Sequence, residues 1–177
     1  MRKQIITFTL CLFCVVSISS QEKLLGILPL SNGKVTYSGE ELVTGANTAQ
    51  LQQRAANWFQ SELKDETRSI SKETENQVLG KGKYKIRARG VGLVGYDMEI
   101  LYSIKIDLKL NGYAYLINEV IGTTEGKFDL IKKPIESWND DFQNEERQNN
   151  KNQKVYPQVD EGMKKVIESL KNVMNGQ

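Results

Sequence analysis

Residues 96–122, YDMEILYSIKIDLKLNGYAYLINEVIG, decide the fold. From Met98 to Leu110 every second residue is apolar, which is the period of a strand with one face buried. Asn111-Gly112 follows, and this dipeptide is typical of two-residue hairpin turns. We therefore predict two antiparallel strands, 96–110 and 113–122, that share one apolar face.

The hairpin also predicts a register. A loop at Asn111-Gly112 pairs Leu110 with Tyr113, Leu108 with Tyr115 and Ile106 with Ile117, and this places both apolar sets on the same face. By this register Glu119 falls on the apolar face. There it is a buried carboxylate with a raised pKa, part of a bulge, or a residue at the sheet margin that reaches water. We predict no catalytic role because no second carboxylate converges on it.

The chain before the hairpin predicts three further strands and one helix. The strands are 34–43, 67–74 and 77–89, with Glu75-Asn76 as a turn. Residues 48–63 form the helix, because its apolar residues recur at helical spacing and Asn47 with Gln50 gives a capping-box signal. Trp58 lies on this apolar stripe, so we assign it to the core and not to ligand stacking.

The C-terminal part of the chain is polar and then helical. We predict that residues 134–156 form a polar connection, anchored at intervals by Trp138, Phe142 and Tyr156. Pro157 is expected to open the final helix. The apolar stripe of that helix is Val159, Met163, Val166, Ile167, Leu170 and Met174.

These elements predict one α+β domain made of residues 21–133 and 157–175. The order strand, helix, four strands, helix fits a curved antiparallel sheet of about five strands. Both helices would cover one face of this sheet, because each has an apolar stripe to bury. The other face would then be open to solvent or to a partner.

Four stretches carry a resemblance to a known family. They are ILPLSNGKVTYSGE, LQQRAANWFQSEL, GKGKYKIRARGVGLVGYDMEILYSIKIDLKLNGYAYLINEV and VDEGMKKVIESLKNVM, and they span most of residues 27–174. This pattern resembles exported bacterial domains of unknown function with a TATA-box-binding-protein-like (TBP-like) fold. The resemblance implies the fold alone, because the family offers no established active site and function resides in sites, not in folds.

Residues 1–20 read as an export signal. Arg2 and Lys3 precede an apolar stretch over residues 5–18, and small serines stand before Gln21, as in a cleaved signal peptide. We expect a periplasmic or extracellular protein with no later membrane span. We expect no lipid anchor on Cys14, because Phe13 precedes it where a lipoprotein signal needs a small residue.

Removal of this segment changes what chemistry is available. Both cysteines, Cys11 and Cys14, lie inside it, and the chain has no histidine. The remaining chain has 22 basic and 22 acidic residues, so net charge indicates no nucleic-acid partner. Without His or Cys we expect no metal centre of the usual kind, no Ser-His-Asp triad and no thiol nucleophile.

We also expect no cofactor. Residues 90–95, GVGLVG, match the dinucleotide fingerprint G-x-G-x-x-G. That fingerprint needs a following helix to hold the pyrophosphate. A strand follows here, so we interpret the glycines as a flexible hairpin connection.

Basic residues recur at every second position from Lys81 to Arg89, so on a strand they share one face. We predict that Arg87 pairs with Glu99 and Arg89 with Asp97 across the neighbouring strand. The residues left as a binding surface are Lys81, Lys83, Lys85, Lys105, Leu101 and Leu116, with Val120 on the same face. An envelope protein, a glycan or an anionic lipid head group would be the partner, and an ordinary solvated face is the alternative.

The sequence thus predicts an exported, non-enzymatic binding or structural module of the bacterial cell envelope that uses its open sheet face. Two alternatives remain. A carboxylate-dependent glycan hydrolase would need two acids in one cleft. A small-molecule carrier would need an apolar cavity beneath Trp58 and Tyr102.

Overall fold

The computed structural model describes residues 23–24, 26–61, 66–89, 95–125, 130–139 and 145–177. The predicted signal at 1–20, most of the glycine motif at 90–95, and Phe142 lie outside the described residues.

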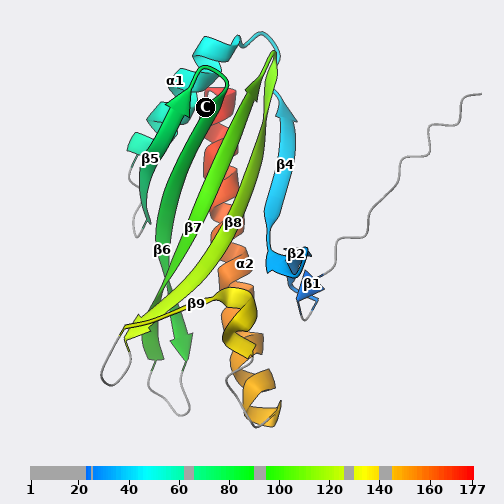
Figure 1. Cartoon of the computed structure of the whole chain (residues 1–177), viewed down its shortest axis with the longest axis vertical. Helices are drawn as coiled ribbons and strands as arrows, with labels where there is room; N and C mark the ends of the chain where they lie inside the picture. Colours follow the sequence, from blue (N-terminus) through cyan, green and yellow to red (C-terminus); the bar gives the residue numbers. More distant parts are fainter. Residues whose placement is uncertain (1–22, 25, 62–65, 90–94, 126–129, 140–144) are drawn as a thin grey trace, which may run out of the picture.

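Six strands form one antiparallel sheet (Figure 1). They are β4 (Tyr37–Leu42), β5 (Glu66–Thr74), β6 (Gln77–Arg89), β7 (Gly95–Lys109), β8 (Gly112–Glu125) and β9 (Leu130–Pro134). The order is β4-β8-β7-β6-β5, and β9 pairs with the end of β8 that β4 leaves uncovered. A small sheet of β1 (Lys23–Leu24), β2 (Leu28–Ser31) and β3 (Lys34–Val35) lies before β4.

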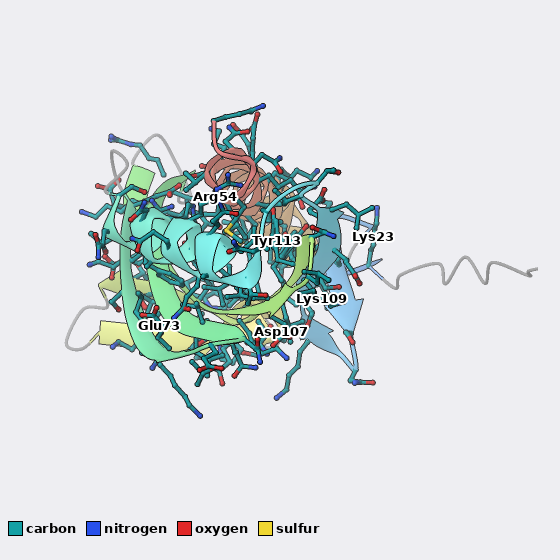
Figure 2. All side chains as sticks on the ribbon, turned by 90° about the horizontal axis from the view of Figure 1, so that it is seen from above. Lys23, Arg54, Glu73, Asp107, Lys109 and Tyr113 are labelled. Atoms are coloured by element: carbon teal, nitrogen blue, oxygen red, sulfur yellow. The ribbon has the colours of Figure 1, made fainter. Side chains whose placement is uncertain are left out.

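Two helices, α1 (Thr48–Gln60) and α2 (Glu145–Asn175), cover one face of the large sheet. Seen from above, the sheet curls around them, so its other face is convex (Figure 2). The predicted α+β class and the two helices on one face are confirmed, but five strands lie between the helices where four were predicted, and the sheet has six strands instead of about five. The capping box is confirmed too, because Gln50 N donates to Asn47 Oδ1 at 2.9 Å and Asn47 N to Gln50 Oε1 at 3.0 Å.

The connection predicted at 134–156 is wrong for most of its length. A 3-10 helix, η1 (Ile135–Asn139), follows β9, and α2 begins at Glu145, so Pro157 lies inside the helix. Residues 145–154 have no apolar stripe, but they are mostly Glu, Gln, Lys and Arg, which favour helix. Trp138 and Tyr156 do anchor the segment: Trp138 Nε1 donates to Lys133 O at 3.0 Å, and Tyr156 is buried with its hydroxyl donating to Ile135 O.

The strand registers differ from the predicted ones by two residues. Leu108 pairs with Tyr113 and Lys109 with Gly112, so the turn consists of Leu110-Asn111. Asn111 has a φ of 60°, which Asn tolerates. Gly112 belongs to the strand instead. It is glycine there because a Cβ would lie 2.5 Å from Glu41 O of β4. A shift of two keeps every side chain on its predicted face.

A bulge in β8 changes the faces beyond it. Leu101 pairs with Ile121 and Ser103 with Asn118, so Glu119 and Val120 both lie opposite Tyr102. Glu119 has a φ of 52° and is exposed, so it is not a buried acid. Val120 is 2% exposed, and its predicted place on the open face is wrong because the extra residue reverses the alternation.

Glycines allow aromatic rings to fill the space between sheet and helices. A Cβ on Gly82 would lie 2.2 Å from the Tyr102 ring, and one on Gly80 would lie 2.1 Å from the Phe59 ring. The Trp58 and Phe59 rings are in edge contact at 4.9 Å. Because these rings occupy the place expected for a carrier cavity beneath Trp58 and Tyr102, the packing argues against that alternative.

Candidate functional site

The open face consists of those residues of β6, β7 and β8 that point away from the helices. All six predicted site residues lie on it: Lys81, Lys83, Lys85, Leu101, Lys105 and Leu116. Lys81 and Lys85 are exposed, and the other four are partly exposed. Both described α-helices, α1 and α2, lie on the other side of the sheet (Figure 2).

Ion pairs neutralise half of the predicted cations. Lys83 Nζ lies 2.7 Å from Glu99 Oε1, and Lys105 Nζ lies 2.7 Å from Asp107 Oδ2. The predicted pairing of Arg87 with Glu99 is wrong, because the actual register places Asp97 opposite Arg87 and Glu99 opposite Lys85. Lys83 then reaches Glu99 diagonally, which long side chains can do across a strand pair.

Asp107 is held in its ionised form. Burial opposes ionisation, but hydrogen bonds from Lys105 and Gln77 outweigh it and lower the pKa of the carboxyl. Gln77 Nε2 donates to Asp107 Oδ1 at 2.7 Å. Lys105 is therefore committed to Asp107 and is a weaker candidate contact than the sequence indicates.

Three cations on this face keep their charge uncompensated by close contacts. Within the described part of the chain, Lys81, Lys85 and Arg87 make no ion pair, and all three are exposed. They lie on the same face of one strand, with about 13 Å from Lys81 to Lys85 and about 7 Å from Lys85 to Arg87. The candidate contact surface is thus a row on β6, flanked by Leu101 of β7.

A buried cation on the opposite face of the sheet was not predicted. The Arg68 side chain is 0% exposed; its Nη1 lies 3.3 Å from Glu66 Oε2, and its Nη2 donates to Ser61 O at 2.6 Å. Its guanidinium also lies over the Trp58 ring, 4.3 Å from the centroid. Position parity could have revealed it, since Glu66, Arg68 and Ile70 alternate with the exposed Thr67 and Ser69.

Burial shifts both members of this pair. It raises the pKa of the Glu66 carboxyl, and Arg68 and Lys165 counteract this only in part. It also lowers the pKa of the Arg68 guanidinium. Burial in a medium of low polarity is thus the main cause of both pKa shifts. Such shifts occur in reactive carboxyls and in structural ion pairs alike.

A hollow of about 330 Å³ lies beside this pair, between the end of β6 and α2. Two carboxylates line it, Glu66 and Glu161. Glu161 is exposed and lies 2.7 Å from Lys165 Nζ, and the hydrogen bond from Lys165 lowers its pKa. The remaining lining residues are Tyr84, Lys85, Ile86, Arg87, Gln158 and Gly162.

Tyrosines join the sheet to α2. The Tyr84 hydroxyl donates to Val159 O at 2.9 Å, and the Tyr37 hydroxyl donates to Asp160 Oδ1 at 3.1 Å. Burial raises the pKa of both phenols, so they stay protonated as donors. Their role is to position the helix. Among the described residues, no group of three or more His, Cys, Asp or Glu could hold a metal ion.

No family model matches the sequence, and no curated protein matches it. Two solved structures share the fold. A DUF4468 family protein from Bacteroides ovatus is 20% identical, with a TM-score of 0.55 over 87% of this chain and 93% of that one. A TBP-like protein from Parabacteroides distasonis is 13% identical, with a TM-score of 0.53 over 82% of this chain and 97% of that one.

These likenesses confirm the TBP-like fold and the resemblance to domains of unknown function at the level of fold. They bring no site residue to this chain. Among the described helices, none is long and apolar enough to cross a membrane.

Proposed function

We propose that the protein is exported and acts as a non-enzymatic binding module of the cell envelope, with the open face as its contact surface. One observation carries this proposal. Lys81 and Lys85 stand exposed beside the partly exposed Leu101, and neither forms an ion pair with a described residue. Cations next to apolar surface suit an anionic partner with some apolar character. An anionic lipid head group, an acidic glycan or an envelope protein has that chemistry.

The proposal of export rests on residues 1–20 of the sequence. The proposal of binding without chemistry rests on residue types. Beyond residue 20 the chain has neither His nor Cys. On the open face, Glu99 and Asp107 are engaged by lysines. The convex shape of this face (Figure 2) suits contact with a broad surface better than enclosure of a small substrate.

The test compares two double variants. Lys81→Ser with Lys85→Ser removes the two lysines of β6 that form no ion pair with a described residue, whereas Lys23→Ser with Lys34→Ser removes two exposed lysines of the small sheet. We expect only the first pair to lower co-sedimentation with the isolated envelope fraction, and we expect wild-type binding to weaken with added salt. Equal co-sedimentation of both variants would overturn the proposal.

One observation favours a second candidate, a carboxylate-dependent glycan hydrolase. Glu66 and Glu161 line one hollow, and their environments move their pKa values in opposite directions, which is the pattern of an acid and a base. Both are engaged by cations, however, Glu66 by Arg68 and Glu161 by Lys165. Release of reducing ends from envelope glycans that is lost in both Glu66→Gln and Glu161→Gln would establish it in place of the binding module.

A further inference from the structure

The edges of the large sheet differ in how they are protected against further pairing. Strand β5 has a bulge between Ile70 and Lys72, and β9 carries two lysines and ends in a proline. Bulges, lysines and prolines are the usual means of keeping an edge from pairing with another chain. Strand β4 has neither lysine nor proline, and its register with β8 is unbroken from Tyr37 to Leu42. Of these edges, β4 is the best suited to accept a further strand.

Alternate backbone groups of β4 point away from the sheet. Val43 N donates to Asn111 O on the β8 side at 2.9 Å, whereas Thr36 N donates to Pro29 O of β2 at 3.0 Å. Because the N–H and C=O groups of successive strand residues point to opposite sides, odd-numbered residues of β4 bond to β8 and even-numbered ones face outward. The outward set is Ser38, Glu40 and Leu42.

Strand β2 covers this edge only near its beginning. Its Pro29 O accepts from Thr36, and among the described residues no strand pairs with the outer side of β4 itself. In Figure 1, β1 and β2 lie beside the lower end of β4. The outward groups of Ser38–Leu42 therefore lack a partner strand within the described part of the chain.

The undescribed segments attach away from this edge. One connects α1 to β5, at the opposite edge of the sheet. Three connect β6 to β7, β8 to β9, and η1 to α2, and their described ends lie at the bottom of Figure 1, whereas Leu42 lies beside the β7–β8 turn at the top. Residues 1–22 and 25 adjoin β1, which is separated from β3 by β2. No described pairing places any of these segments opposite Ser38–Leu42.

Two features of the edge select apolar side chains in a partner strand. Leu42 is 83% exposed, the highest value among the large hydrophobic residues that the structure describes. At Gly39 a Cβ would lie 2.6 Å from the Tyr115 hydroxyl, so the strand has a gap over that ring. An aromatic side chain opposite an edge glycine fills such a gap. In an antiparallel partner, the residue opposite Leu42 comes three positions before the residue opposite Gly39.

We propose that the β4 edge binds an extended, uncharged segment of a partner protein, which adds a strand antiparallel to Ser38–Leu42. Charge does not select a charged segment, because Glu40 lies 2.7 Å from Lys109 Nζ and Glu41 lies 2.5 Å from Lys171 Nζ. A second copy of the chain suits the edge less well. The antiparallel registers that overlap most of β4 would place Glu40 opposite Glu40 or Glu41 opposite Glu41, and like charges directly opposite each other destabilise a pair.

The experiment uses four acetylated pentapeptide amides, X-Thr-Thr-Z-Thr, in which X is Leu or Val and Z is Tyr or Trp. Hydrogen exchange of single amides, followed by NMR, measures their effect on the purified protein. Alone, the amides of Glu40 and Leu42 should exchange rapidly, while those of Gly39 and Glu41 should be protected by β8. We expect at least one peptide to slow exchange at Glu40 and Leu42 about tenfold or more.

Main-chain pairing is tested on both partners. Methylation of the third peptide nitrogen, which would face Glu40, should abolish binding, whereas methylation of the second, which would point away, should be tolerated. Glu40→Pro removes one outward N–H and keeps every bond to β8, as proline on an edge strand can. It should weaken binding about tenfold, since one hydrogen bond to the peptide is lost. Glu40→Ser keeps the N–H and should bind as the wild type does.

Three results would overturn the proposal. One is failure of all four peptides to slow exchange at Glu40 and Leu42. Another is protection of these two amides in the protein alone, since residues 1–22 or a second copy would then already cover the edge. The third is binding that is insensitive to methylation of the third nitrogen and to Glu40→Pro, or to Leu42→Pro if Glu40→Pro does not fold.

The open-face variant separates this inference from the proposed function. Lys81 and Lys85 lie on β6, which β7 and β8 separate from β4. Lys81→Ser with Lys85→Ser should therefore lose envelope association and still bind the peptide. Loss of peptide binding in this folded variant would contradict the assignment of the peptide to β4.

Discussion

The two faces of β6 follow opposite rules. Toward the helices the strand presents Gly80, Gly82, Tyr84 and Ile86, and each meets a ring or a helix of the core. Away from them it presents Lys81, Lys83, Lys85 and Arg87, of which only Lys83 forms an ion pair with a described residue. The inner residues are explained by packing alone. The outer lysines contribute little to packing, so their identity points to what the protein contacts.

The largest expected effect comes from substitution of the buried cation, Arg68. Arg68→Met should lower the free energy of unfolding by about 3 kcal/mol, because Glu66 and the Ser61 carbonyl lose their partner inside the protein. Arg87→Met, on the outer face, should change it by no more than about 0.5 kcal/mol. Urea denaturation measures both. Equal effects would mean that the two faces do not differ in this way.

A second test reverses the usual effect of glycine in a helix. Gly→Ala within a helix ordinarily stabilises by about 0.5–1 kcal/mol. At Gly162 a Cβ would lie 2.2 Å from the Tyr84 ring, so Gly162→Ala should instead destabilise by about 2 kcal/mol. Thermal unfolding measures the sign. In the background of Tyr84→Leu, which removes the ring, the cost should shrink, and full additivity would contradict the proposed clash.

The pH dependence of stability tests the inner face without any substitution. Burial raises the pKa of Glu66 in the folded protein above its ordinary 4.5. The folded state therefore holds more protons than the unfolded state as pH rises through this range, and stability should fall as pH rises from about 4.5. Asp107 and Glu161 have lowered pKa values, so their opposite contributions lie below their ordinary pKa values. Unfolding measured from pH 4.5 to 7 should show a flatter slope in Glu66→Gln.

The smallest expected effect is at the bulge and has the opposite sign. Glu119 is exposed with a φ of 52°, a conformation that costs a non-glycine residue about 1 kcal/mol. Its carboxylate accepts from Ser103 Oγ at 2.6 Å, an exposed bond of small net value. Glu119→Gly should therefore stabilise the protein by about 0.5 kcal/mol, and Glu119→Val should destabilise it, as calorimetry would show.

Sequence periodicity predicted most of the fold because it arises from the buried residues that form the core. The alternation of residues 98–110 and the helical spacing around Trp58 both reflect burial, and both elements lie where expected. The first half of α2 and the short strand β9 were missed. Residues 145–154 have helix-favouring composition without an apolar stripe, and β9 is only five residues long, so neither gives a periodic signal.

The candidate site was predicted less completely because charge pairing depends on register. Face assignment needs only parity, so all six proposed residues lie on one face. Which acid meets which lysine depends on a shift of two residues, to which parity is blind. Glu99 therefore forms an ion pair with Lys83 and not with Arg87, and Arg87 has no ion pair with a described residue. The hollow between β6 and α2 could not be predicted, because it depends on how α2 packs beside the strand, which local sequence does not encode.

The bulge has an implication for how this chain can change its length. Without Glu119, the run from Tyr113 to Thr123 would alternate between inward and outward side chains without interruption, with Val120 following Asn118 in step. Glu119 behaves as a single inserted residue, and the bulge confines its effect on strand pairing to the position opposite Tyr102. Related chains that lack this one position should keep the same core on both sides of the gap, so a one-residue deletion in an alignment at this point would mark a straighter strand with the same fold.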